Sequence, residues 1–275
     1  IACLYAFTNV FAPETQENLS ASNFNKVEKQ RFTSAFKIAI KTLKKSRRIF
    51  WGDTSYRYIL PWYMVTGLDK SGKTTFIQNS GLNIPSNKLT DRNIDIGNGD
   101  SIFICDHLVL LDTAVPFASQ EKQFLSDHLN ELLKKIRPTQ PLNGVIFLID
   151  INRIISGSLA NVAIMGQEAR EHISRLQEDL GVAPPIYVVF THLDAVPGFT
   201  AFFQGTAIVP KNQPYGITLP VLSDGERMDD ESTVAQLDQK FDEFVQWQKP
   251  WMFERIAREF IPQTRYEAFI FQTTS

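Results

Sequence analysis

Short apolar runs alternate with longer amphipathic segments along the chain from Arg57 onward. The apolar runs predict β-strands at 59–66, 101–105, 108–112, 144–149 and 186–191. The amphipathic segments predict helices at 73–80, 120–136 and 161–180. This alternation is typical of an α/β fold, in which a mostly parallel sheet carries helices on both faces. Only Asp106 and His107 separate the second and third strands, so we expect a hairpin that gives the sheet one antiparallel strand.

Helical patterns flank this central region. Phe32, Phe36, Ile40 and Leu43 share one face of a predicted N-terminal amphipathic helix. Its basic tail at 41–48 fits an anionic membrane surface or, as we favour, an ordinary solvated helix end, because cations suit a helix C-terminus anyway. Beyond Asp194 the periodicity weakens, and a helical pattern then runs through 231–260, where we expect an interruption at Pro250. The expected parts are an N-terminal segment at 1–50, an α/β domain at 51–209, and a loop with a helical extension at 210–275.

The composition of the 275-residue chain narrows the classes of partner. Its net charge is −2 and its pI about 6.1, so no positive field is available to attract nucleic acid, and we expect none as a partner. The cysteines and histidines lack metal-ligand spacing. No apolar run reaches the roughly 18 residues of a membrane-spanning helix. The chain begins without methionine, and we expect it to be a piece of a longer protein.

A glycine-rich stretch, GLDKSGKTT, joins the first predicted strand to a predicted helix. Gly67, Gly72, Lys73 and Thr74 match the phosphate-loop pattern of a glycine, four residues, then Gly-Lys-Ser/Thr. The glycines let backbone N–H groups point at an anion, Lys73 reaches the β- and γ-phosphates, and the Thr74 hydroxyl ligates Mg²⁺. We therefore interpret 51–209 as a P-loop nucleotide-binding domain for Mg²⁺ with GTP or ATP. The predicted contacts in the loop are Gly67, Leu68, Asp69, Lys70, Ser71, Gly72, Lys73, Thr74 and Thr75.

A second candidate residue for the nucleotide site, a possible Mg²⁺ ligand, lies at the end of the predicted strand 108–112. Asp112 ends this apolar run, where a carboxylate can hold Mg²⁺ opposite Thr74. The alternative is an aspartate that only caps a turn. GTPases continue this motif with a glycine that contacts the γ-phosphate, but the chain has Val115 there, followed by Pro116. A β-branched residue and a residue without an N–H suit a mobile switch poorly.

A third candidate part of the nucleotide site, a motif for base recognition, follows the last predicted strand. In GTPases an Asn/Thr-Lys-x-Asp run reads guanine, and Thr191 and Asp194 fit this pattern. His192 replaces the lysine, and an imidazole can also stack on a purine although it carries no fixed charge. We predict that Thr191, His192 and Asp194 contact the base. The alternative is a turn after a strand.

The residues needed for hydrolysis are less complete. Thr90 is the best candidate for a threonine that senses the γ-phosphate, although it is at least as well explained as an ordinary loop residue. Arg92 is a possible charge stabiliser. Nothing resembles a water-positioning glutamine after Asp112. The sequence therefore supports nucleotide binding better than nucleotide turnover.

Five stretches in the region 60–220 resemble the cytoplasmic nucleotide-binding region of the IcmF/TssM family, inner-membrane components of bacterial type VI and type IVB secretion machines. They are LPWYMVTGLDKSGKTTFIQNSGLNIP, LLDTA, PLNGVIFLIDI, PIYVVFTHLDAVPGF and YGITLP. The antiparallel strand and the phosphate loop also occur in GTPases. LPWY before the loop and SGL after it are more specific to this family. The family often carries glycine where Lys70 and Val115 stand here.

The resemblance implies membrane-spanning segments outside this chain, a location on the cytoplasmic side of the bacterial inner membrane, and a DotU/TssL-type partner within a secretion complex. Our leading hypothesis is a nucleotide-binding module in which Mg²⁺-nucleotide stabilises the complex with slow or no hydrolysis. The second is an active NTPase that powers assembly. The third is a nucleotide-free pseudo-NTPase scaffold that docks partners.

Overall fold

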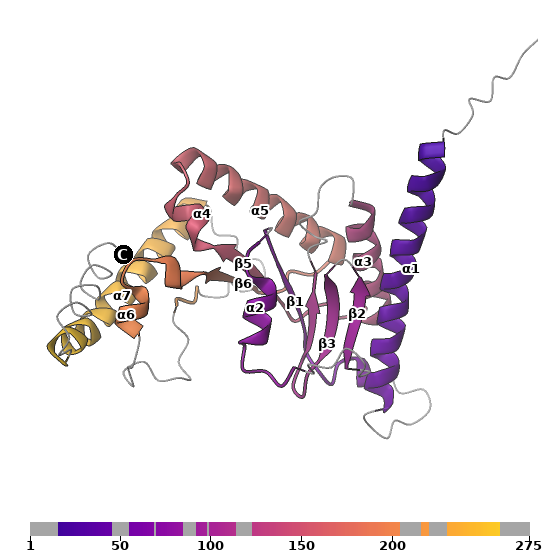
Figure 1. Ribbon diagram of the computed structural model, residues 1–275, viewed down its shortest axis with the longest axis horizontal. Helices are drawn as coiled ribbons and strands as arrows, with labels where there is room; N and C mark the ends of the chain where they lie inside the picture. Colours follow the sequence, from indigo (N-terminus) through magenta and orange to yellow (C-terminus); the bar gives the residue numbers. More distant parts are fainter. Residues whose placement is uncertain are drawn as a thin grey trace, which may run out of the picture. The chain divides into compact units, whose positions relative to one another are not determined.

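The computed structural model describes residues 16–45, 55–68, 70–84, 92–97, 99–113, 123–203, 216–219 and 230–258. The chain divides into two compact units, Ile1–Thr191 and His192–Ser275. The first unit contains the sheet and the phosphate loop. The second begins at His192, inside the stretch predicted to read the base. Figure 1 shows the elements of both.

The first unit is built on a six-stranded sheet with the order β2-β3-β4-β1-β5-β6. The strands are β1 (Trp62–Gly67), β2 (Asn93–Gly97), β3 (Asp100–Ile104), β4 (Val109–Asp112), β5 (Gly144–Asp150) and β6 (Ile186–Thr191). β1 pairs in parallel with β4 and β5, and β5 pairs in parallel with β6. β3 is antiparallel to both of its neighbours. The predicted mostly parallel sheet with one antiparallel strand is confirmed.

The predicted hairpin is the β3–β4 pair. Ile104 lies opposite Val109, and the Cys105 N–H donates to the Leu108 carbonyl over 2.9 Å. β1 starts at Trp62 rather than at Ile59 as we predicted, because the 3₁₀ turn Ser55–Arg57 and a bend occupy the residues before it. β2 was not predicted. It is a five-residue edge strand in which buried Ile94 and Ile96 flank the exposed Asp95, a pattern too short to stand out in the sequence.

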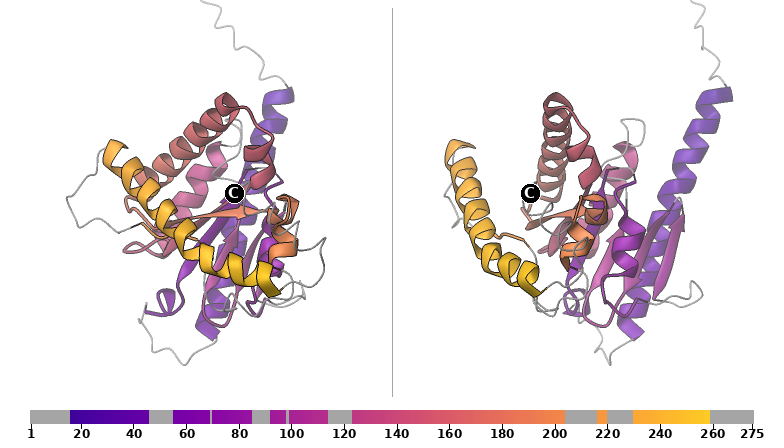
Figure 2. Two further views of the ribbon diagram at one scale, coloured as in Figure 1. Left: turned by 90° about the vertical axis from the view of Figure 1, so that its left-hand side faces the viewer. Right: turned by 60° about the vertical axis from the view of Figure 1, so that its left-hand side comes forward.

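Helices cover both faces of the sheet, as predicted. α1 (Gln16–Lys45), α3 (Gln123–Ile136) and α5 (Leu159–Leu180) contribute side chains to one large apolar cluster with the strands. The smaller cluster on the other face contains Ile77 of α2 (Lys73–Gln78) with Val65, Leu110 and Leu148. Figures 1 and 2 show α1 lying along β2, in agreement with the close contact between these elements.

α1 packs through the predicted apolar face. Phe32, Phe36 and Leu43 are buried, and the Phe36 ring stacks on Trp62 with centroids 5.9 Å apart. Full burial of such a side chain stabilises the fold by about 2 kcal/mol. The helix starts at Gln16, earlier than the apolar pattern suggested, because its first turns are polar. In its basic tail, the Lys44 ammonium lies 5.0 Å from the centre of the Tyr56 ring.

The second unit contains helices and short irregular segments where the structure describes it. It contains a 3₁₀ turn at Leu193–Ala195, α6 (Phe199–Phe203) and α7 (Asp230–Arg258). α7 continues through Pro250, so the predicted interruption is wrong. A proline removes one backbone donor, and the neighbouring helical hydrogen bonds can persist around it. No helix in the described ranges is long and apolar enough to cross a lipid bilayer.

Candidate nucleotide site

The phosphate-loop sequence joins the end of β1 to the start of α2. β1 lies between β4 and β5, so the loop emerges at the carboxyl ends of the parallel strands. Ligands of open α/β sheets bind at this edge. The Ser71 N–H donates to the Leu68 carbonyl over 3.1 Å, and α2 begins at Lys73. The local path is therefore strand, tight turn and helix, as the motif requires.

Both motif glycines occupy positions that disfavour a side chain, for different reasons. A Cβ on Gly67 would lie 2.4 Å from the Leu148 carbonyl oxygen on β5 and 2.9 Å from the Ser71 hydroxyl. Gly72 has a φ of 75°, the left-handed conformation that glycine adopts at little cost. Close packing at Gly67 and the left-handed turn at Gly72 together fix the course of the loop.

Asp112 lies beside this loop on β4. It pairs in register with Val65 of β1, two residues before Gly67, and its side chain is buried. Its Oδ1 has no hydrogen-bond partner among the described residues. Burial raises the pKa of the Asp112 carboxyl to about 6, the positive charge of Lys73 lowers the pKa, and the nearby Asp100 raises it. A buried carboxylate within the field of the loop lysine is suited to a divalent cation.

The residues present fit Mg²⁺. Thr74 places an exposed hydroxyl one residue after Lys73, and Asp112 supplies a carboxylate. No group of three or more Asp, Glu, His or Cys side chains that could hold a metal occurs in the described ranges. Mg²⁺ does not need such a group, because it is usually held by one or two protein oxygens together with phosphates and water.

Two further buried hydroxyls near the loop have no partner in the described structure. They are Thr66 Oγ1, in β1 directly before Gly67, and Ser71 Oγ inside the loop. Each of these hydroxyls can form a further hydrogen bond beside the loop. The sequence motif includes Ser71, but it gave no reason to select Thr66. Its only signal is its position directly before the loop.

Asp100 was also missed by the sequence reasoning. It is buried at the start of β3, and the β3–β4 register places its neighbour Ser101 opposite Asp112. The hairpin therefore brings a second carboxylate to the Asp112 end of the sheet. Without the register, Asp100 is only one of several polar residues before the predicted strand 101–105.

The residues predicted to read the base are described in separate units. Thr191 ends β6, and its hydroxyl lies 2.9 Å from the Ser71 carbonyl and 3.2 Å from the Ile149 carbonyl, to which it can donate. Thr191 thus supports the backbone of the loop. His192 has a φ of 57° and precedes the 3₁₀ turn, in which Asp194 is exposed. Base recognition by Thr191, His192 and Asp194 stays a prediction.

Several predicted residues cannot be placed. Asp69, Thr90, Val115 and Pro116 lie outside the described residues. Arg92 is described and pairs with Asp106 at 3.1 Å, in the turn between β3 and β4. Because this turn is at the start of β4, it lies at the opposite end of the strand from Asp112. The structure therefore does not support Arg92 as a charge stabiliser.

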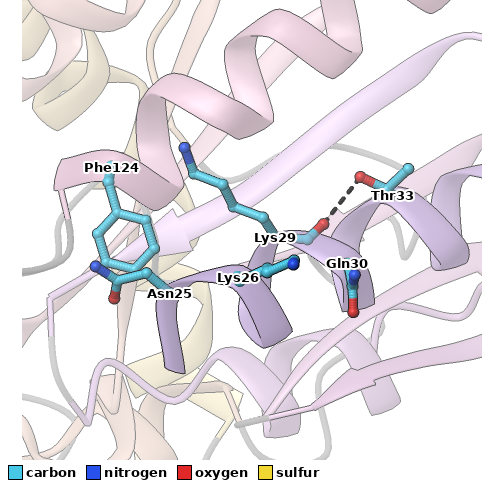
Figure 3. A pocket seen from close by; sticks show the side chains of 6 residues that line it. All are labelled: Asn25, Lys26, Lys29, Gln30, Thr33 and Phe124. Atoms are coloured by element: carbon cyan, nitrogen blue, oxygen red, sulfur yellow. Dashed lines mark hydrogen bonds between the residues drawn. The ribbon is translucent and has the colours of Figure 1, made fainter. Parts of the chain in front are cut away.

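A separate hollow of about 380 Å³ lies between α1 and α3. Figure 3 shows its lining, which is Asn25, Lys26, Lys29, Gln30, Thr33 and Phe124. The Lys29 ammonium lies 5.7 Å from the centre of the Phe124 ring, and the Thr33 hydroxyl donates to the Lys29 carbonyl over 2.9 Å. None of the predicted nucleotide contacts lines it, so it is not part of the candidate nucleotide site.

The strand order and the strand-loop-helix at Gly67 define a P-loop protein with a GTPase-like α/β fold. Comparison with known families then identifies the protein family within this fold class. The IcmF-related N-terminal domain matches residues 120–274, more than half of the chain, and the chain belongs to this family. The family resemblance seen in the sequence is confirmed.

Two individual proteins are also similar. The chain is 31% identical over 271 residues to the type VI secretion system component TssM1 of Pseudomonas aeruginosa. The alignment covers 95% of this chain but only 24% of that protein, so the chain spans about a quarter of the relative's length. A GDP-bound ADP-ribosylation factor-like GTPase, SAR1 of Encephalitozoon cuniculi, matches at 13% identity over 65% of this chain and 83% of its own, with a TM-score of 0.20. That score is too low to support an inference.

Proposed function

We propose that this chain is the nucleotide-binding part of a secretion-system scaffold and holds Mg²⁺-GTP or Mg²⁺-ATP through its phosphate loop. The observation that carries the proposal is the buried Asp112, with one oxygen unpartnered, beside a loop that contains Lys73. A buried carboxylate needs a positive partner, and Lys73 alone leaves its pKa raised. A Mg²⁺ ion that arrives with nucleotide supplies the missing charge.

Each residue of the loop has a defined task in this proposal. The backbone N–H groups between Gly67 and Lys73 donate to phosphate oxygens, and the Lys73 ammonium neutralises phosphate charge. Thr74 and Asp112 hold the cation, which bridges and neutralises phosphate oxygens when it is bound. Thr191 supports the loop through the Ser71 carbonyl. Asp194 and His192 are proposed to contact the base, with guanine preferred.

We propose that binding stabilises the assembled complex and that hydrolysis is slow or absent. Val115 and Pro116 replace the glycine-containing switch that rapid GTPases use at this point. The one candidate charge stabiliser that the structure describes, Arg92, is paired at the far end of β4. An active NTPase remains the second candidate, because the loop itself is complete. A pseudo-NTPase that only docks partners is the third.

The proposed cellular location and partners are argued from the similarity to TssM1. TssM1 is a component of a type VI secretion system, and the chain corresponds to about a quarter of it. We propose that the chain works on the cytoplasmic side of the bacterial inner membrane and that membrane segments outside this chain anchor it. A DotU/TssL-type inner-membrane protein and other subunits of a type VI or type IVB complex are the proposed partners.

Calorimetric titration of the chain with GTP, ATP and their diphosphates in the presence of Mg²⁺ tests this proposal. We expect Lys73→Ala to weaken triphosphate binding by about 100-fold, because it removes the cation nearest the β- and γ-phosphates. Lys37→Ala is the matched control, since it removes an exposed lysine of α1. Full affinity in Lys73→Ala would defeat the binding proposal.

Two further arms of the same experiment separate the finer proposals. If Asp194→Ala leaves the ratio of GTP to ATP affinity unchanged, the assignment of base recognition is wrong. Phosphate release over many turnovers, well above that of Lys73→Ala, would favour the active NTPase. A chain that binds no nucleotide under any of these conditions would favour the scaffold.

A further inference from the structure

Lys70 occupies a strained backbone conformation inside the phosphate loop. Its φ is 60°, and only one other non-glycine residue of the described structure, His192, has a positive φ. The left-handed conformation costs an ordinary L-residue about 1 kcal/mol, whereas glycine adopts it freely. A lysine at this position therefore lowers the stability of the folded chain relative to a residue that fits. Such strain persists at positions where another property of the side chain is needed.

The Lys70 side chain makes no contact that would explain this cost. It is exposed, and it forms no hydrogen bond or ion pair with any residue that the structure describes. It also stabilises no apolar cluster of the first unit. Within the described fold, the lysine brings strain without a compensating interaction.

The position of Lys70 suggests what the side chain does. It lies between Gly67 and Gly72, three residues before Lys73, in the turn that a polyphosphate would occupy. A lysine ammonium is a compact charge on a flexible stem of four carbons, about 6 Å long, so it can reach an anion bound anywhere in this short loop. A nucleoside triphosphate keeps an excess of negative charge after Mg²⁺ and Lys73 are counted.

We propose that Lys70 supplies a second ammonium group to the phosphates of the bound nucleotide and that the strained loop is maintained for this purpose. The inference rests on the proposed nucleotide binding and deepens it. It makes the loop selective for polyphosphates, because a second cation contributes most where two or three phosphates lie together.

Three substitutions separate the charge of Lys70 from its strain. Lys70→Arg keeps both charge and strain, Lys70→Ala keeps the strain alone, and Lys70→Gly removes both. Lys37→Ala, on α1, is the control for the loss of one positive charge elsewhere. The whole 275-residue chain is used, and the probes are the fluorescent analogues mant-GTP and mant-ATP with Mg²⁺, titrated at low and high salt. Thermal melting without nucleotide is measured in parallel.

We expect Lys70→Ala and Lys70→Gly to bind both probes about tenfold more weakly, with a smaller salt dependence, and Lys70→Arg to bind within about twofold of the wild type. Lys70→Gly should melt at the same temperature as the wild type or above it, because the strain is gone. This combination of retained stability and lost affinity is not expected for a residue that merely supports the fold.

Two results would overturn the inference. If Lys70→Gly and Lys70→Ala bind the probes as tightly as the wild type, the second ammonium has no role, and the proposed function stands without it. If Lys70→Gly melts well below the wild type, Lys70 acts in folding instead. Failure of the proposed function gives a different pattern, since the wild type itself would then bind neither probe and both proposals would fall.

Discussion

Two opposing effects act on the pKa of the Asp112 carboxyl, namely its burial and the positive charge of Lys73. The carboxyl is buried at 6% exposure, and burial raises its pKa from the ordinary 3.8 to about 6 despite the field of Lys73. Below about pH 4 the carboxyl is protonated in both the folded and the unfolded chain. Between pH 4 and 6 it is protonated only in the folded chain, so the free energy of unfolding falls as the pH rises through this window. Above pH 6 the fold carries the cost of a buried charge, about 3 kcal/mol at most.

Asp112→Asn should remove this cost. Without nucleotide, we expect the variant to be more stable than the wild type at pH 7.5 by about 1 to 3 kcal/mol, and the difference should shrink as the pH falls towards 4. Urea denaturation of both proteins across this pH range measures it. If the difference in free energy of unfolding between variant and wild type does not change with pH, the Asp112 carboxyl is exposed to water in solution. The same variant should bind Mg²⁺-nucleotide more weakly than the wild type.

At the level of residues, the sequence predicted those site residues that are recognised by their spacing within a short stretch. The glycines, Lys73 and Thr74 lie within eight positions of one another, and Asp112 ends an apolar run. The position of Asp100 near Asp112 and the bond from Thr191 to the loop depend on contacts between distant segments, which no local pattern contains. The left-handed conformation of Lys70 was also beyond prediction, because lysine gives no sign of a positive φ.

The end of α3 is fixed by a buried cation. Arg137, 1% exposed, follows α3 directly and donates to Asn143 Oδ1 over 2.9 Å, and this same oxygen accepts the Trp62 N–H at 2.8 Å. Its guanidinium lies 5.5 Å from the Trp62 ring and 5.1 Å from the Tyr58 ring. Burial lowers the pKa of Arg137 to about 10, so it stays charged at neutral pH. The helix, the start of β1 and the residue before β5 therefore meet at one side chain.

Truncation of Arg137 should destabilise the chain without affecting the nucleotide site. We expect Arg137→Ala to lower the free energy of unfolding by about 3 kcal/mol, since it leaves a cavity and removes one of the two hydrogen bonds that Asn143 Oδ1 accepts. Arg137→Met fills the space without a buried charge and should lose at least about 1 kcal/mol less. Urea denaturation measures both. Mg²⁺-nucleotide affinity of the folded variants should stay unchanged, because Arg137 lies at the end of β1 opposite the loop. An equal loss in both variants would contradict the role of packing.

Among the elements, the long periodic helices were predicted most closely, and two short elements were missed. α3 and α5 lie close to the ranges given by their apolar spacing. β2 and the short helix α4 (Ile151–Ile155) were missed, because β2 lies in a largely polar stretch and α4 follows β5 directly. β2 is held in place by contacts with α1, which is distant in the sequence. It packs against α1, and a Cβ on Gly97 would lie 3.1 Å from the Arg31 guanidinium.

For the whole molecule, the sequence indicated both the fold class and the family. The family match and the strand order agree with those predictions. The function was harder to predict because the chain spans about a quarter of its relative's length. Its near-neutral charge also offers no electrostatic sign of a partner.

Nucleotide binding should be visible as stabilisation of the whole chain. A ligand that binds only the folded state at 100 times its dissociation constant adds about 2.7 kcal/mol. This corresponds to a rise in Tm of about 5 °C for the cooperative unit that contains the site. Differential scanning calorimetry with Mg²⁺ and GTP or ATP measures the rise, which should shrink when EDTA replaces Mg²⁺. An equal rise with and without Mg²⁺ would contradict the role of Asp112 and Thr74 in holding the cation.

The hydrogen bond from Thr191 to Ser71 joins residues 120 positions apart. The phosphate loop is encoded near the first quarter of the chain, yet one of its carbonyls is held by the last residue of β6. A ribosome must therefore synthesise the chain beyond Thr191 before the loop can take its final form. During translation, the β1 and α2 segments are therefore synthesised long before the hydrogen bond that holds the loop can form.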